Sequence, residues 1–252
     1  MAGHDPILLA VAAAITLFAG VVKGAVGFAM PMVMISGLAS IMPAEQALAA
    51  LIVPTLVTNG IQALRQGRGA AWQSIVEYRR MLIALSLTIL VSAQLVPFIP
   101  QTLLLIVLGL PIVAFALSQL AGWQFRFHAD SRARAEVTAG VVGGFFGGIS
   151  GVWGPPTIAL LISLDAGKAE SVRVQGVVYL IGAAVLTVAH LGSGVLNAGT
   201  LPLSVILTLP GTVGLFIGFA IHDRLDQARF RRWTLVVLVV TGLNLLRRAL
   251  AL

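Results

Sequence analysis

Residues Gly143–Pro156 read Gly-Gly-Phe-Phe-Gly-Gly-Ile-Ser-Gly-Val-Trp-Gly-Pro-Pro and contain six glycines and two prolines. Glycine costs about 1 kcal/mol relative to alanine inside a helix, and proline removes a helical hydrogen bond. Proline is nevertheless well suited to the first turn of a helix. The stretch therefore predicts a helix that breaks among the glycines and starts again near Pro155 and Pro156.

The rest of the chain is strongly apolar. Of its 252 residues, 58% are hydrophobic and 10% are charged. Backbone groups in lipid must be bonded internally, so membrane-spanning runs of this kind are helices. No basic segment precedes the first run, so we expect a retained first span and not a signal peptide. Runs near the length of about 20 residues that crosses a bilayer lie at 6–22, 81–98, 102–121, 201–221 and 233–246.

Several classes of protein are excluded by composition. The chain has no cysteine, which rules out disulfides and thiolate ligands, and its apolar segments hold too few carboxylates for a metal site. No Walker motif is present, and we expect no cofactor. The net charge of +7 comes from arginines spread over short loops, which argues against a nucleic-acid-binding face.

The glycine motif occurs twice. Gly20-x3-Gly24-x2-Gly27-x3-Pro31 recurs, shifted by 124 residues, as Gly144-x3-Gly148-x2-Gly151-x3-Pro155. Such self-similarity indicates a duplicated unit. We expect a first repeat at 1–122, a cytoplasmic linker at 123–136 and a second repeat at 137–252.

Loop charges predict that the two repeats have opposite orientations. Eleven of the sixteen basic residues fall in the loops 65–80, 123–136 and 222–232, which the positive-inside rule places in the cytoplasm. The first of these loops matches, in the repeat, the uncharged loop at 192–200. We therefore expect two inverted-topology repeats of about five membrane helices each, with helices broken at the glycine motifs, as in many secondary transporters. Arg247 and Arg248 do not fit this scheme, and an eight-span arrangement remains an alternative.

The glycines allow three interpretations. The spacing Gly20-x3-Gly24 suits close packing of membrane helices. A broken helix would instead aim free amides and the positive end of its dipole at an anion, and two such breaks would form one site at the repeat interface. The third interpretation is a rhomboid-like intramembrane protease, with Ser150 as the nucleophile and His190 as its base. We favour the broken helix and expect no catalytic residue.

A few polar residues within the apolar segments are candidates for the site. Lys23 could supply positive charge, or it could extend toward the membrane surface. Trp153 could donate its indole N–H into the cavity, or it could lie at the interface. One polar helical stripe consists of Thr55, Thr58, Asn59 and Gln62, and the corresponding helix of the second half carries Gln175, Tyr179 and Gly182 at similar spacing. Each stripe could bind substrate or only join helices. We expect Arg65 and His190 at helix ends, where each could contact a proton or substrate or serve only a structural role.

Taken together, the two motifs resemble those of the TauE/SafE sulfite exporter family, over Phe18–Gly122 and Gly140–Gly242. The second motif, GGISGVWGPP, is the closer match, because KGAVGFAMP has Phe28, Ala29 and Met30 where the family has smaller residues. The resemblance implies transport of sulfite, sulfoacetate or other sulfonates across the bacterial inner membrane. The family's motif positions, which the resemblance implies are functional, are Gly24, Gly27, Pro31, Gly148, Gly151, Gly154 and Pro155.

We therefore predict a multi-pass exporter of small sulfur-containing anions that lies in membrane lipid. The alternative is a proton- or sodium-coupled permease that takes up a small carboxylate or sulfonate. A homodimer is also compatible with the sequence. The predicted substrate-binding residues are Lys23, Gly24, Gly27, Asn59, Gly148, Ser150, Gly151, Trp153, Gly154, Gln175 and Tyr179.

Overall fold

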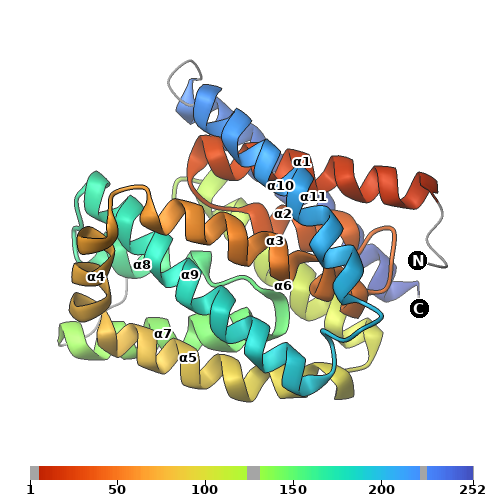
Figure 1. The fold of residues 1–252 in the computed structure, drawn as a ribbon, viewed down its shortest axis with the longest axis horizontal. Coiled ribbons are helices and arrows are strands. Elements are labelled where there is room, and N and C mark those ends of the chain that lie inside the picture. Colours follow the sequence, from red (N-terminus) through yellow and green to blue (C-terminus); the bar gives the residue numbers. More distant parts are fainter. Residues whose placement is uncertain (1–5, 124–130, 222–225, 252) are drawn as a thin grey trace.

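The computed structural model describes residues 6–123, 131–221 and 226–251 and contains only helices as regular elements in these ranges (Figure 1). The predicted all-helical class is therefore confirmed. The helices are α1 (Pro6–Val26), α2 (Met30–Leu38), α3 (Ala44–Leu64), α4 (Arg68–Glu77), α5 (Arg79–Ser92), the 3-10 helix η1 (Ala93–Phe98), α6 (Gln101–Leu120), α7 (Arg132–Ser150), α8 (Gly154–Ser163), α9 (Lys168–Ser193), α10 (Leu201–Ile221) and α11 (Gln227–Leu250).

Seven segments of the described chain are long and apolar enough to cross a membrane. Helix α7 is not among them, because its charged first turns and its glycines lower its hydropathy. Helices α2 and α8 are too short to cross a bilayer core alone. The spans are Pro6–Val26, Ala44–Leu64, Arg79–Phe98, Gln101–Leu120, Glu170–Ser193, Leu201–Ile221 and Arg232–Leu250.

Both glycine motifs interrupt a helix, as expected. The α1/α2 break lies between Val26 and Met30, where Gly27 and Ala29 have φ of 86° and 75°. The α7/α8 break lies between Ser150 and Gly154, and Gly151 has φ of 71°. A left-handed residue ends a helix because it turns the backbone away from the helical path.

The other glycines of the motifs pack helices together. An added Cβ at Gly24 would overlap the carbonyl oxygen of Leu215 on α10, and one at Gly148 would overlap Ser92 of α5. Backbones this close are typical of small-residue interfaces between membrane helices. The packing and broken-helix interpretations are thus both realised, by different glycines of one motif.

Three pairs of packed helices surround the central pair α3 and α9. Helices α3 and α9 lie side by side, α1 packs on α10, α5 packs on α7, and α6 packs on α11. Each broken helix is thus held by a helix from the other half of the chain. Helix α1 begins, and helix α11 ends, at the right-hand end of Figure 1.

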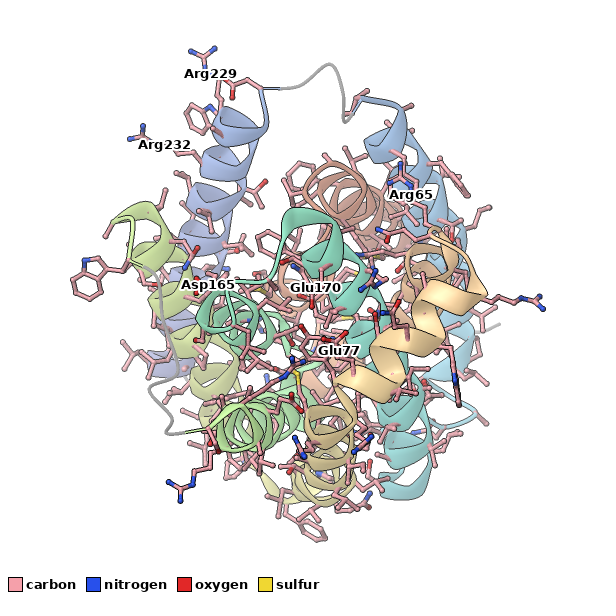
Figure 2. All side chains as sticks on the ribbon, turned by 90° about the vertical axis from the view of Figure 1, so that its left-hand side faces the viewer. Arg65, Glu77, Asp165, Glu170, Arg229 and Arg232 are labelled. Carbon is pink, nitrogen blue, oxygen red and sulfur yellow. The ribbon has the colours of Figure 1, made fainter. Side chains whose placement is uncertain are left out.

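Charged side chains gather at the opposite end of the molecule, which we call the charged end. Figure 2 looks onto it and labels Arg65, Glu77, Asp165, Glu170, Arg229 and Arg232. Helices α1 and α3 run toward this end, whereas α7 and α9 run away from it (Figure 1). Helix α7 begins at Arg132, so the last five residues expected in the linker 123–136 are helical, and residues 124–130 lie outside the described ranges.

Candidate anion-binding site

A small cavity joins the two breaks at the centre of the molecule. Its volume is about 20 Å³, which is room for about one water molecule. One wall comes from the α1/α2 break, the opposite wall from the α7/α8 break, and Tyr179 of α9 completes it. The lining residues are Lys23, Phe28, Ala29, Pro31, Met32, Gly151, Val152, Trp153, Gly154 and Tyr179. We call this the central cavity.

Lys23 brings a positive charge to this cavity. Its side chain is 1% exposed, and its amine donates hydrogen bonds to Thr58 Oγ1 at 3.2 Å and to Asn59 Oδ1. No carboxylate in the described ranges forms an ion pair with it. Because a buried ammonium without a counter-charge is costly in a membrane, the site favours an anionic ligand.

Asn59 holds this lysine and joins the two halves of the chain. Its Oδ1 accepts from Lys23, while its Nδ2 donates to the backbone oxygen of Tyr179 at 2.9 Å. Thr58 assists, because its hydroxyl donates to Pro54 O at 2.7 Å and so leaves a lone pair for the ammonium. Neutral partners of this kind position the charge without cancelling it.

Two helix N-termini also face the central cavity. Helix α2 begins at Met30 after Ala29, and α8 begins at Gly154 after Trp153. The first amides of a helix have no partner within that helix, and the N-terminus carries partial positive charge. Because Pro31, Pro155 and Pro156 have no N–H, the free amides in these first turns are those of Met30 and Met32 in α2 and of Gly154 in α8. Two short helices and Lys23 therefore present positive potential from different directions to one small space.

Trp153 lies in the wall of the central cavity, where neighbouring glycines leave space for its ring. It is 1% exposed, and an added Cβ at Gly182 would be 3.2 Å from its ring. An added Cβ at Gly154 would be 3.3 Å from the hydroxyl of Tyr179. The indole thus lies in the protein interior, and these glycines leave room for both aromatic rings.

Side chains from the next long helix secure each broken end. Gln62 of α3 donates to Gly27 O at 3.0 Å, and His190 of α9 lies 3.0 Å from Gly148 O through Nε2. The other ring nitrogen of His190 lies 3.0 Å from Ser193 Oγ. The structure therefore gives His190 a partner in the backbone of the break, outside the central cavity.

Ser150 forms hydrogen bonds with the backbone at the α7/α8 break. Its hydroxyl donates to Phe146 O at 2.6 Å and accepts from Val152 N at 3.2 Å. The pairing of Ser150 with His190 that a protease dyad requires is thus not formed. Ser150 instead lines a separate apolar cavity of about 370 Å³ between α6, α7 and α8.

The remaining predicted residues lie outside the central cavity. Gln175 lines a neighbouring cavity, and the side chain of Thr55 is buried without a hydrogen-bond partner. Arg65 is exposed at the end of α3 with its guanidinium 4.3 Å from the ring of Phe219. Gly24 and Gly148 face α10 and α5, as described above, and Pro156 lines the apolar cavity.

Sequence reasoning missed several residues of the site. Phe28 and Ala29 were seen only as departures from a pattern of small residues, and Met32 was not singled out, yet all three line the central cavity. Thr58 was placed on the same polar stripe as Asn59 but was not predicted to take part in the site, although it accepts a hydrogen bond from Lys23. Nothing in the spacing of the sequence signals Val152.

One comparison with known proteins identifies a family. The family model described as Sulfite exporter TauE/SafE matches residues 12–245, which is most of the chain. Among curated proteins and among solved structures, no match was found.

Proposed function

Since the chain belongs to the sulfite exporter TauE/SafE family, a family of membrane transporters and not of enzymes, we propose that it exports small sulfur-containing anions. The proposed substrates are sulfite, sulfoacetate and other sulfonates. The proposed location is the bacterial inner membrane. The observation that carries the proposal is the ammonium of Lys23, which is buried in the central cavity and has no ionic partner among the residues that the structure describes.

The chemistry of the central cavity suits an oxyanion. Lys23 offers donors on one side, and the N-termini of α2 and α8 offer backbone amides and dipole ends on the others. A tetrahedral or pyramidal oxyanion has several acceptor oxygens that can be met at once by donors from different directions. No carboxylate is among the lining residues to repel it.

We further propose that residues 1–122 and 137–252 are inverted repeats of about five membrane helices each. The support is the direction of the helices: α1 and α3 run toward the charged end, and their counterparts α7 and α9 run away from it (Figure 1). In each half, the first helix packs against a helix of the other half, α1 on α10 and α7 on α5, which agrees with an inverted repeat. Rocking of the two substructures around a fixed site would then give access to either side.

The membrane potential and the lack of carboxylates in the cavities favour export over uptake. A membrane potential that is negative in the cytoplasm drives an anion outward, by about 2.3 kcal/mol per charge for 100 mV. Uptake would need a coupled proton or sodium ion, and neither the central cavity nor its neighbours offer a carboxylate to bind one. We therefore propose an electrogenic exporter without a coupling ion.

The function can be tested in liposomes that contain the purified protein. With an inside-negative potential, we expect efflux of sulfite and sulfoacetate, and loss of this flux in Lys23→Met. Losing a charged hydrogen bond should weaken binding about tenfold or more. Arg68→Met removes an exposed cation on α4 and should leave flux unchanged. If wild-type protein moves neither anion, the proposed function is wrong.

A further inference from the structure

A second cavity adjoins the central cavity on the side of the charged end. Its volume is about 230 Å³, and it is lined by Val26 at the end of α1, Gly27 and Phe28 of the α1/α2 break, Gln62 of α3, Ile158 of α8, and Val172 and Gln175 of α9. Val172 is 40% exposed, and α3 ends and α9 begins at this end (Figure 2). We call this cavity the vestibule.

Phe28 belongs to both cavities. It lines the central cavity and the vestibule, and its side chain is only 8% exposed. An edge-to-face contact holds its ring against Phe115 of α6, with centroids 6.4 Å apart and planes at 84°. Phe28 therefore lies at the junction of the vestibule and the central cavity.

On the strength of the proposed function, we propose that the vestibule is the route by which the anion reaches the central cavity from the charged end, and that the ring of Phe28 closes this route. The vestibule walls carry the amide side chains of Gln62 and Gln175 and no carboxylate. An anion in the vestibule thus meets polar groups without like-charge repulsion.

The other cavity beside the central one does not suit an anion. The apolar cavity between α6, α7 and α8 also touches Val152, but its lining is almost wholly hydrocarbon, with Ser150 as its one hydroxyl-bearing residue. That hydroxyl already donates to Phe146 O. An anion entering there would lose its water without gaining a donor. The vestibule is therefore the better path.

Both walls of the vestibule make contacts with neighbouring helices, but they differ in backbone conformation. The α9 wall is tied to neighbouring helices at the charged end, because Tyr78 donates to Glu170 at 2.7 Å and Arg173 donates to Ser74 at 2.9 Å. Burial raises the pKa of the Tyr78 phenol above its ordinary value, so this donor keeps its proton. On the opposite wall, Phe28 lies between two left-handed residues, Gly27 and Ala29, where a change of backbone angle can move the ring.

The natural absence of cysteine allows a direct test of the route. Single cysteines would replace Gln175 in the vestibule, Gln73 on the surface of the charged end, and Ala198 on the surface of the opposite end. The probe is methanethiosulfonate ethylsulfonate, an impermeant thiol reagent that is itself a sulfonate. In liposomes of known protein orientation, we expect Gln175→Cys to react from the same side as Gln73→Cys and not from the side of Ala198→Cys.

A fourth cysteine tests the role of the ring. Met32 lines the central cavity and is 2% exposed, so Met32→Cys should react slowly from the charged end. Adding Phe28→Ala removes the ring and its contact with Phe115, and we expect the reaction to become about tenfold faster. The matched control is Phe216→Ala, which removes an exposed phenylalanine of α10 and should have no effect. Phe28→Leu serves the same purpose if Phe28→Ala does not fold.

Distinct results would overturn the inference. Reaction of Gln175→Cys from the side of Ala198→Cys would place the route elsewhere, and an unchanged rate for Met32→Cys without the Phe28 ring would show that the ring closes nothing. Either result could occur in a protein that still exports sulfite, so it would leave the proposed function intact. Conversely, absence of flux in the wild type would refute that function, whichever cysteines react with the thiol reagent.

Discussion

The amine of Lys23 and the side-chain oxygen of Asn59 form a hydrogen bond between α1 and α3. The amide nitrogen of the same Asn59 reaches the backbone of Tyr179 in the other half of the chain. One neutral side chain thus bonds both the buried charge and the backbone of the other half. Its neutrality matters, because an acidic residue there would satisfy the ammonium internally.

We therefore expect Asn59→Asp to abolish binding of sulfite and sulfoacetate. The new carboxylate would neutralise Lys23, and like-charge repulsion would oppose the anion. Thr58→Val removes a neutral acceptor without adding charge, so it should weaken binding only about fivefold to tenfold. The measurement is the rise in melting temperature caused by each anion in detergent. Equal anion-dependent stabilisation of Asn59→Asp and the wild type would contradict this account.

The glycines of the breaks should tolerate alanine unequally. Gly151→Ala combines a left-handed φ of 71° with a new Cβ 2.9 Å from Leu51 Cδ1. Gly27→Ala has a φ of 86° but open space around the Cβ, so strain of about 1–2 kcal/mol is its main cost. Gly167 has neither problem. Unfolding in detergent should rank Gly151→Ala as the least stable and Gly167→Ala as equal to the wild type; the reverse ranking would count against the described breaks.

His190 should act as a positioning residue for the end of α7. His190→Ala leaves the buried carbonyl of Gly148 without its partner, which should cost about 1–3 kcal/mol of stability. His190→Gln keeps a donor and should recover much of this loss. Because no proton transfer at His190 is needed, the pH dependence of transport in His190→Gln should match that of the wild type. A displaced pH profile with normal stability would instead assign a proton to this side chain.

The two ends of the molecule should lie on different sides of the membrane. Most of the basic loop residues lie at the charged end, which the positive-inside rule places in the cytoplasm. The start of α1 and the end of α11 lie at the other end (Figure 1), with Arg247 and Arg248 as exceptions. Alkaline phosphatase fused to the C-terminus should therefore be active outside the cytoplasm. If alkaline phosphatase were active only when fused in loop 65–80, the orientation would be the opposite of the one expected.

Local chemistry made the helix breaks predictable, because glycine and proline act on their own backbone. The same reasoning could not separate the glycines that pack from those that break, since the partner of Gly24 is on α10 and that of Gly148 is on α5. The site itself was partly predictable: Lys23 and Asn59 stood out as polar residues in apolar segments. Phe28 did not, because its position depends on contact with Phe115, a residue far away in sequence.

The exchange of helices between the halves also bears on how the protein is made. When α1 leaves the ribosome, the helix that covers its glycines does not yet exist, because α10 is translated near the end of the chain. Until then, Gly20 and Gly24 lack the backbone of α10 that packs against them in the finished molecule. The packing of α1 against its partner is therefore completed only near the end of synthesis, after every residue that lines the central cavity has been translated.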